Sequence, residues 1–301
     1  MGNFAKTSIS KAINKQYSNR VILYLESKED YDVFKERWYK DWGEWIDFKA
    51  VDTPKGGDGG SSQVYRQVEY DRENNTPAFG IVDRDAFLND FIFPDQMDQI
   101  SFFESDHSVF DNIQVLENHI KVLRRWEIEN YLLHPDAIAK LIESCENNEG
   151  KCASNQASQC LLDFSDTAIL LSAAILVLMK EKEKAFTDNF GRDATNNVER
   201  KKIIIEYLEK RDIKNIEDKL KEMIKRIHTF QREESCSEEA RWNQLNHLIN
   251  GKVFLTQFCH WLGFKDPRRL ELAGRIRDDK LIDPEIQEFM DSLQSKAKLL
   301  S

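Results

Sequence analysis

The chain has 301 residues, 41% of them hydrophobic and 32% charged, so it can bury a core and remain in solution. Its net charge of −10 at pH 7 argues against a protein that binds nucleic acid through a general excess of positive charge, although acidic metal ligands contribute to that sum. Five cysteines without a Cys-x-x-Cys pair favour neither a disulfide framework nor a zinc ribbon.

The N-terminal residues 1–20 lack the apolar core of a secretion signal. The longest apolar run, 168–179, is interrupted by Ser172 and is shorter than the ~20 residues that cross a bilayer. We therefore expect a cytoplasmic protein without membrane contact, in which this run forms a buried helix.

The first half of the chain alternates between strand-like and helix-like segments. The expected strands are 21–25, 45–51, 78–82, 113–116 and 120–123, and the expected helices are 28–42, 61–70 and 135–145. Short runs that are apolar throughout suit strands covered on both faces, as in a parallel sheet. The pattern predicts an α/β domain with a mostly parallel sheet flanked by helices, which we expect to span residues 1–146.

The second half is patterned as helices throughout. The expected segments are 161–187, 195–210, 212–232, 237–250, 252–263 and 283–299. Residues 147–159 are polar and contain Gly, Ser and Asn, as is typical of a linker. We therefore expect an α-helical domain over residues 160–301, serving dimerisation or partner binding.

Acidic residues directly follow two of the expected strands. Glu26 follows 21–25, and Asp83 and Asp85 follow 78–82. In parallel α/β sheets, ligands bind beyond the carboxyl ends of the strands, so these carboxylates are expected to face one crevice. The plainer alternative is that they form turns and helix caps.

A third acidic pair, Glu127 and Glu129, comes after the last expected strand. Clustered carboxylates repel one another unless cations or raised pKa values stabilise them. Carboxylate oxygens suit Mg²⁺ or Mn²⁺, and a pair of such ions can activate water and stabilise the leaving oxygen of a phosphodiester. The sequence therefore predicts a metal-dependent phosphodiesterase site, with Arg84 pairing with its neighbouring aspartates as the alternative for that motif.

Three motifs in this order resemble the TOPRIM (topoisomerase–primase) domain of OLD-type nucleases. They are Val-Ile-Leu-Tyr-Leu-Glu at 21–26, Gly-Ile-Val-Asp-Arg-Asp at 80–85 and Glu-Ile-Glu-Asn-Tyr-Leu-Leu at 127–133. Within that family, the length and helical second half are similar to the AriB-type TOPRIM effectors of PARIS anti-phage defence systems. The motifs cover roughly residues 20–135, with one further match at Asn-Gly-Lys, 250–252.

The resemblance implies a role for each matching residue. It implies that Glu26 binds metal or acts as a general acid or base, and that Asp83 and Asp85 bind metal. Glu129 matches the glutamate before Asn-Tyr, and Lys252 matches a late lysine that steadies the transition-state phosphate. Two departures are Ser27, where many TOPRIM domains have glycine, and Glu127, where OLD-type proteins often have serine; Glu127 is a further expected metal ligand.

Family behaviour implies a conditional toxin. Effectors of this kind are held inactive by an ABC-type (AriA-like) ATPase partner, assemble as homodimers once released, and cut host tRNA. The alternatives are an OLD-type DNA nickase or nuclease, and a non-catalytic adaptor built on a TOPRIM scaffold.

Basic residues before the third acidic pair are candidates for nucleic-acid binding. Lys121, Arg124 and Arg125 could contact substrate phosphates, and the cluster 265–269 is a second candidate. A solvated surface is an equally good interpretation of either cluster.

Overall fold

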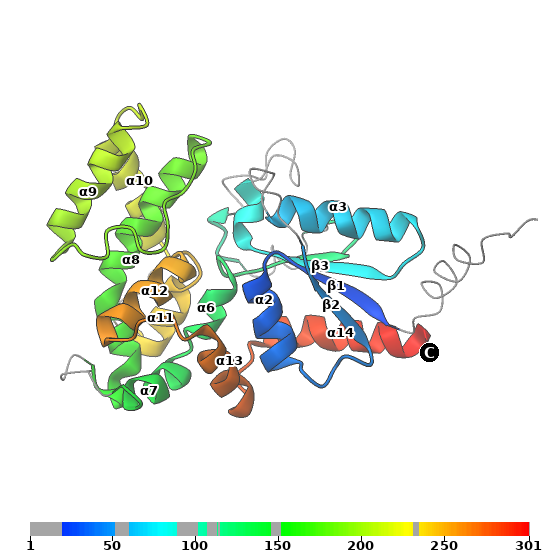
Figure 1. Cartoon of the computed structure of the whole chain (residues 1–301). Helices are drawn as coiled ribbons and strands as arrows, with labels where there is room; N and C mark the ends of the chain where they lie inside the picture. The colour runs from blue at the N-terminus through cyan, green and yellow to red at the C-terminus, as the bar shows by residue number, and fades with distance from the viewer. Residues whose placement is uncertain are drawn as a thin grey trace, which may run out of the picture. The chain divides into compact units, whose positions relative to one another are not determined.

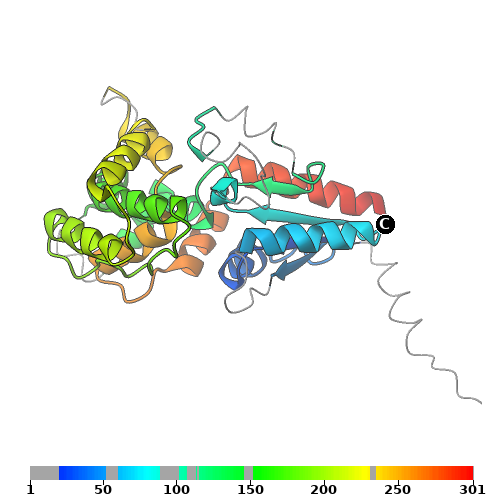
Figure 2. The same cartoon turned by 90° about the horizontal axis from the view of Figure 1, so that it is seen from above.

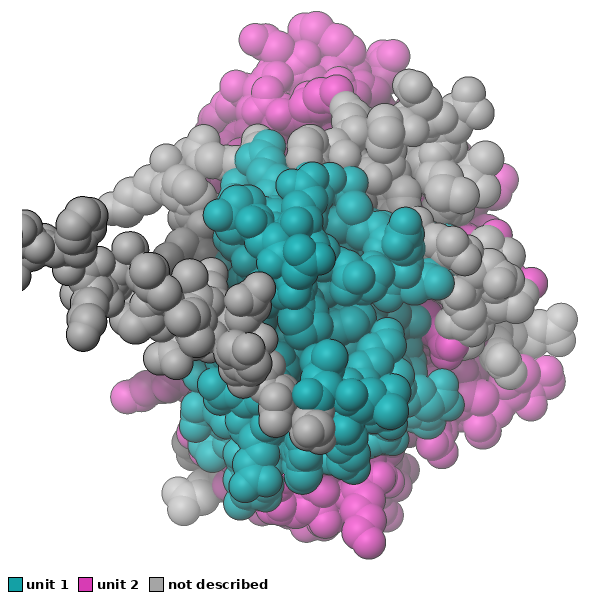
Figure 3. Space-filling view, turned by 90° about the vertical axis from the view of Figure 1, so that its right-hand side faces the viewer, with its two compact units in different colours: residues 1–82, 112–122, 282–301 teal, residues 83–111, 123–281 magenta. Residues whose placement is uncertain are grey.

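The computed structural model of the chain describes residues 20–51, 60–88, 102–106, 113, 115–145, 152–230 and 235–300. The chain forms two compact units, which are coloured separately in Figure 3. Unit 1 comprises residues 1–82, 112–122 and 282–301, and unit 2 comprises residues 83–111 and 123–281.

Unit 1 is built on a four-stranded sheet in which every pairing is parallel. Its strands, in the spatial order β2-β1-β3-β4, are β2 (Ile46–Ala50), β1 (Val21–Leu25), β3 (Ala78–Val82) and β4 (Ile120–Val122). All residues of β1 and β3, the two central strands, are buried. A parallel sheet flanked by helices is thus confirmed, because only strands covered on both faces are apolar at every position.

The helices of unit 1 cover both faces of this sheet. They are α2 (Lys28–Val33), which continues as a π-helical segment Phe34–Trp38, α3 (Gly60–Glu73) and α14 (Pro284–Leu300). Ser27 caps α2 by accepting a hydrogen bond from the backbone N–H of Asp30, at 3.1 Å. The helix was expected to reach residue 42, but it ends at Trp38, after its turns have widened to the π-helical form.

Neighbouring residues of β3 show which helix covers which face. A Cβ on Gly80 would lie 2.4 Å from Val64 of α3, so this face accepts only glycine under the helix. The adjacent Phe79 ring faces Lys296 of α14, whose ammonium lies 4.5 Å from the ring centroid. Alternation along the strand therefore places α3 and α14 on opposite faces, as Figures 1 and 2 show.

The prediction of a strand at 113–116 is wrong for the residues of that range that the structure describes, 113, 115 and 116. Val115 forms only an isolated antiparallel bridge with Ile120. Leu116, Glu117 and Asn118 have positive φ angles, so the chain reverses there and enters β4.

Unit 2 is helical in its described residues. Its helices are α6 (Ile128–Leu132), α7 (Pro135–Glu143), α8 (Ala157–Lys180), α9 (Asn197–Glu209), α10 (Ile216–His228), α11 (Glu238–Leu245), α12 (Gly251–Leu262) and α13 (Arg269–Asp278), with short 3₁₀ turns at Arg84–Leu88 and Ser154–Gln156. Helix α8 lies at the centre, in contact with α7, α9, α10, α11 and α12 (Figure 1). The pattern did not predict α13, because it begins among the charged residues of the 265–269 cluster.

The central helix is long and apolar enough to cross a membrane, with a mean hydropathy of 1.9 over its most apolar window. However, 78% of that window is buried among the other helices of the protein. Its composition is therefore that of a core helix, as expected for the run 168–179.

The two units are not separated at a single point in the chain near residues 147–159, the segment expected to be a linker. Helix α14 packs on β1 and β2, so the end of the chain belongs with the sheet. Residues 123–145 belong instead with the helices of unit 2. Both assignments arise from packing between segments distant in sequence, which composition along the chain does not report.

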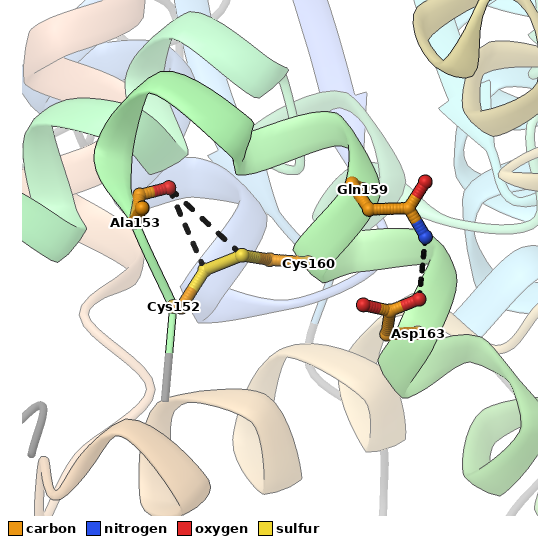
Figure 4. The surroundings of a disulfide bond; sticks show 5 residues. All are labelled: Cys152, Ala153, Gln159, Cys160 and Asp163. Carbon is orange, nitrogen blue, oxygen red and sulfur yellow. Dashed lines mark hydrogen bonds between the residues drawn. A yellow bond between two sulfur atoms is a disulfide. The ribbon is translucent and has the colours of Figure 1, made fainter. Parts of the chain in front are cut away.

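A disulfide joins Cys152 to Cys160, with their Cα atoms 5.9 Å apart (Figure 4). The sequence argued against a disulfide framework, and the structure shows this one local bond among the described cysteines. The pair closes a short loop at the start of α8, so a spacing that matches no multi-cysteine framework still allows one local bond. In a reducing compartment the same two residues would be thiols.

Candidate active site

Glu127 begins helix α6 and closes it with a reciprocal cap. Its backbone N–H donates to Asn130 Oδ1 at 3.0 Å, while its side chain accepts from the backbone N–H of Asn130. This arrangement satisfies donors that the first turn of a helix leaves without partners. The Glu-x-x-Asn spacing therefore orients the Glu127 carboxylate locally, independently of its contacts with the rest of unit 2.

Asn130 then anchors α6 to the chain just before α12. Its amide donates to the backbone oxygens of Asn246 and Ile249, at 2.8 and 2.9 Å. Asn246 returns a hydrogen bond to the Asn130 backbone oxygen at 2.7 Å. All three residues are buried, so the two helix starts are held together by a closed polar network.

Gly251, the first residue of α12, lies against the same asparagine. A Cβ at this position would come within 2.6 Å of Asn130 Oδ1 and 2.8 Å of its backbone N. Only glycine permits this approach, which gives the Asn-Gly-Lys sequence a structural reason.

Lys252, the next residue, meets Glu127 through two groups. Its backbone N–H donates to Glu127 Oε1 at 2.8 Å, and its ammonium lies 3.7 Å from Oε2. Its positive charge also acts on Asp85, whose carboxyl is hydrogen-bonded to Trp126. Unit 2 thus brings together four residues expected in the site, Asp85, Glu127, Glu129 and Lys252.

The pKa values in this group are set mainly by burial. Burial raises the pKa of Glu127 to about 8, against the lowering effect of Lys252, and the charges of Glu129 and Asp85 add to the rise. Burial also raises the pKa of Asp85, although part of that residue's surface is exposed. Glu127 therefore retains a proton near neutral pH unless a cation replaces it.

Glu129 is 1% exposed and faces an arginine from α13. Arg269 Nε lies 2.8 Å from Glu129 Oε1, and its Nη2 lies 3.7 Å from Asp188 Oδ2. Nε and Oε1 form a close ion pair without the alignment of a hydrogen bond. Within the described part of the chain, neither Arg269 Nε nor Glu129 Oε2 has a hydrogen-bond partner. A buried carboxylate oxygen without a partner is unfavourable, so this position would gain from a further cation or donor.

The carboxylate oxygens of these residues suit a divalent cation, but in this structure they contact cationic side chains of the protein. Across the described ranges, no three His, Cys, Asp or Glu side chains gather closely enough to hold a metal ion. Glu127 and Glu129 are engaged by Lys252 and Arg269, which supply the positive charge that such carboxylates require. The unpartnered Oε2 of Glu129 and the proton held by Glu127 are the groups that a cation would use or displace.

The Asp-x-Asp motif lies at the start of unit 2. Asp83 is buried, and the intervening Arg84 is 1% exposed. Arg84 donates to the backbone oxygens of Phe102, at 2.7 Å, of Glu104, at 2.6 Å, and of Arg124. Arg84 thus ties its own segment to two others, 102–106 and the chain at Arg124, through its guanidinium, a role that an alternating charge pattern does not reveal.

Glu26 belongs to unit 1 and directly follows β1. It is half-buried and lies against Gly60, the first residue of α3, where a Cβ would be 2.8 Å from Oε2 and 3.0 Å from the backbone oxygen. The neighbouring parallel strand, β3, ends at Val82, directly before Asp83 in the sequence.

The three basic residues expected at a nucleic-acid surface have protein contacts. In unit 1, the Lys121 ammonium lies 3.1 Å from Glu285 Oε1, and both side chains are largely buried. In unit 2, Arg125 lies over the Tyr131 ring at 5.1 Å, and its backbone N–H donates to the Tyr131 hydroxyl. Arg124 is half-buried. A phosphate would have to replace or share these contacts.

Four residues of this site were not predicted in their observed roles: Asn130, Asn246, Gly251 and Arg269. Arg269 was part of a basic cluster interpreted as a phosphate contact or a solvated surface, and nothing in its spacing indicates a buried glutamate as its partner. Comparison of the chain with family models, curated proteins and solved structures gave no match.

Proposed function

We propose that this protein is a metal-dependent nuclease whose acidic site contains Asp85, Glu127, Glu129 and Lys252. The observation that carries the proposal is the grouping of three carboxyl groups and one lysine at the joined starts of α6 and α12. Burying so many like-charged groups together is costly, and catalytic sites are where such pKa shifts concentrate. Glu26 and Asp83 complete the proposed set on the strength of their positions after β1 and β3.

The residues of unit 2 would each contribute a defined step. Lys252 offers an ammonium for a phosphate oxygen, and its own backbone N–H keeps Glu127 in place. Glu127, with a pKa of about 8, can hold or release a proton near neutral pH. Arg269 orients Glu129 and stabilises its charge.

Mg²⁺ or Mn²⁺ fits this donor set, because Glu129 keeps one oxygen without a partner and hard cations prefer carboxylates. When bound, a pair of such ions supplies an activated water and stabilises the leaving oxygen of a phosphodiester.

The finer proposal follows the sequence resemblance. We infer a TOPRIM effector of an anti-phage system of the PARIS type, held inactive by an ABC-type ATPase and cutting tRNA as a homodimer once released. The ordered motifs at 21–26, 80–85 and 127–133 support this inference. An acidic chain can act on RNA in this way because the positive charge is needed only locally.

The experiment is a cleavage assay on total tRNA and on supercoiled plasmid, with purified full-length protein. Glu127→Gln, Lys252→Ala and Glu26→Ala are each expected to lower cleavage about 100-fold or more, as is typical when a charge-stabilising group is removed. Glu217→Ala, on the exposed start of α10, is the matched control and should cleave normally. EDTA should stop cleavage and Mn²⁺ should restore it. Undiminished cleavage in EDTA, or by the Glu127→Gln variant, would contradict the proposal, and plasmid cleavage without tRNA cleavage would favour the DNA nuclease.

One observation favours a second candidate, the non-catalytic adaptor. Glu127 and Glu129 already have cationic partners in Lys252 and Arg269, as they would in a purely structural network. In that case no nucleic acid is cut at any metal concentration, and the same variants change only stability or partner binding.

A further inference from the structure

Arg269 lies between two carboxylates of unit 2 and forms an ideal pair with neither of them. Its Nε is 2.8 Å from Oε1 of Glu129, and its Nη2 is 3.7 Å from Oδ2 of Asp188. Arginine binds a carboxylate most strongly when two parallel N–H groups donate to its two oxygens. The contact with Glu129 lacks this form, because Arg269 Nε and Glu129 Oε2 have no hydrogen-bond partner within the described part of the chain. The guanidinium is thus shared between two carboxylates.

The imperfect pair is costly because Glu129 is only 1% exposed. A buried ion pair offsets its lost hydration only when its geometry is good and its remaining polar atoms are hydrogen-bonded. In the part of unit 2 that the structure describes, one oxygen of Glu129 and one N–H of Arg269 do not meet this condition. Glu129 would therefore gain from exchanging the guanidinium for a cation that binds carboxylate oxygens directly, as Mg²⁺ and Mn²⁺ do.

Asp188 is placed to take the arginine that Glu129 releases. It lies in the chain between α8 and α9, and its side chain is 42% exposed. Gln257 of α12 holds this segment by donating to the backbone oxygens of Asp188, at 3.3 Å, and of Phe190, at 2.9 Å. The ring of Phe190 also stacks on that of Phe186, with centroids 4.3 Å apart. The second carboxylate is therefore held in position before any exchange takes place.

The exchange requires a side chain to move, not a helix. Helix α13 contacts α6 and α7 (Figure 1), and its Leu272, Ala273 and Ile276 are buried. The Arg269 side chain, at the start of α13, is 19% exposed and already lies within 4 Å of both carboxylates. Rotation about its own bonds is enough to lengthen the contact with Glu129 and to shorten the other.

We propose that Arg269 is an internal counterion that keeps the acidic site closed to metal, and that Asp188 receives it when a divalent cation binds Glu129. In this exchange each carboxylate keeps a positive partner, so no charge is left buried alone. Strengthening the pair with Asp188 favours metal binding, and strengthening the pair with Glu129 opposes it. The inference rests on the proposed metal-dependent function and adds the regulation of the same site.

The test is a titration of the full-length protein with Mn²⁺, without nucleic acid, in which electron paramagnetic resonance measures the free ion. Arg269→Gln removes the competing charge and should bind Mn²⁺ about tenfold more tightly than the wild type. Asp188→Asn removes the acceptor and should bind it about fivefold more weakly. Arg268→Gln and Asp193→Asn, in more exposed pairs, are the matched controls and should change the affinity less than about twofold. Glu129→Gln should abolish the binding, which assigns the ion to this site.

A double variant separates the exchange from a general effect of charge. Removing a positive or a negative charge near any metal site shifts the affinity in these same directions. If Asp188 acts through Arg269, Asp188→Asn should change the affinity less than about twofold in a protein that already carries Arg269→Gln, whereas independent effects would add. Asp188 is half exposed, so its variant should fold even where Arg269→Gln is destabilised.

Three results would overturn the inference: an Mn²⁺ affinity that Arg269→Gln leaves unchanged, one that Asp188→Asn leaves unchanged, or effects that add in the double variant. In each case, binding that is lost in Glu129→Gln leaves the nuclease proposal standing. If neither the wild type nor Arg269→Gln binds Mn²⁺, both proposals are contradicted. Binding by Arg269→Gln but not by the wild type supports the closed site most directly.

Discussion

Two glutamates, one in each compact unit, lie next to a glycine that begins a helix, yet their surroundings differ. Glu26 in unit 1 follows a strand, is half-buried, and lies against Gly60 of α3. Glu127 in unit 2 begins a helix, is 5% exposed, and accepts from the first turn of α12, next to Gly251. The first lies where a strand ends and the helix α3 begins in unit 1, whereas the second is held between the starts of α6 and α12, which are distant in sequence.

The difference concerns how each carboxylate is stabilised. A half-buried carboxylate at the end of a strand keeps contact with solvent and needs no dedicated cation. A buried pair such as Glu127 and Glu129 requires protons or positive charge: Glu127 keeps a proton beside Lys252, and Glu129 faces Arg269. The acidic residues of unit 2 should therefore be far more sensitive than Glu26 to the loss of a neighbour.

The largest effect is expected from Arg269→Ala. This change leaves Glu129 buried without its cation, and breaking a buried ion pair in this way costs about 3 kcal/mol of unfolding free energy. Urea unfolding measures the loss, and Mn²⁺ should restore more stability to this variant than to the wild type. Arg268→Ala, the matched neighbour in a more exposed pair with Glu271, should cost about 0–1 kcal/mol. Equal effects of the two variants would mean that Glu129 does not depend on its partner.

A smaller effect is expected from Gly251→Ala. The new Cβ would meet both the backbone and the side chain of Asn130, which hydrogen bonds hold in place, so we expect a loss of about 1–3 kcal/mol. Gly60→Ala meets the carboxylate, the Cβ and the backbone oxygen of Glu26, at 2.8, 2.9 and 3.0 Å. Only the carboxylate can turn toward solvent, but these contacts are less close than those at Gly251, so this variant should cost less. Gly43→Ala is the control, because its nearest neighbour is the mobile end of Lys35. A larger loss from Gly60→Ala than from Gly251→Ala would reverse the comparison.

The smallest effect, counted per pH unit, is a dependence of the unfolding free energy on pH. Between pH 4.5 and about 8, folded Glu127 keeps a proton that the unfolded chain has released. The unfolding free energy should therefore fall as pH rises through this window, by at most about 1.4 kcal/mol per pH unit. Glu127→Gln should remove this slope, while the slopes of other groups, such as His119, are common to both proteins and cancel in the difference. Identical slopes in both proteins would show that Glu127 is ionised throughout.

The sequence by itself determined the features that depend on local burial. Strands β1 and β3 begin and end where apolar runs begin and end, because strands covered on both faces leave no polar position. The same pattern placed Glu26 and Asp83 directly after strands. The six helices expected in the second half correspond to α8, α9, α10, α11, α12 and α14, with boundaries shifted by up to seven residues.

Only the tertiary structure decided the partners. Arg269 pairs with Glu129, Gly251 fits Asn130, Cys152 bonds to Cys160, and α14 returns to the sheet. Periodicity reports which face of a segment is buried but not which other segment buries it. Which charged side chains pair depends on distances that exist only after the helices have packed. In the sequence, the basic cluster 265–269 cannot be distinguished from a solvated surface, yet it contains Arg269, the partner of buried Glu129.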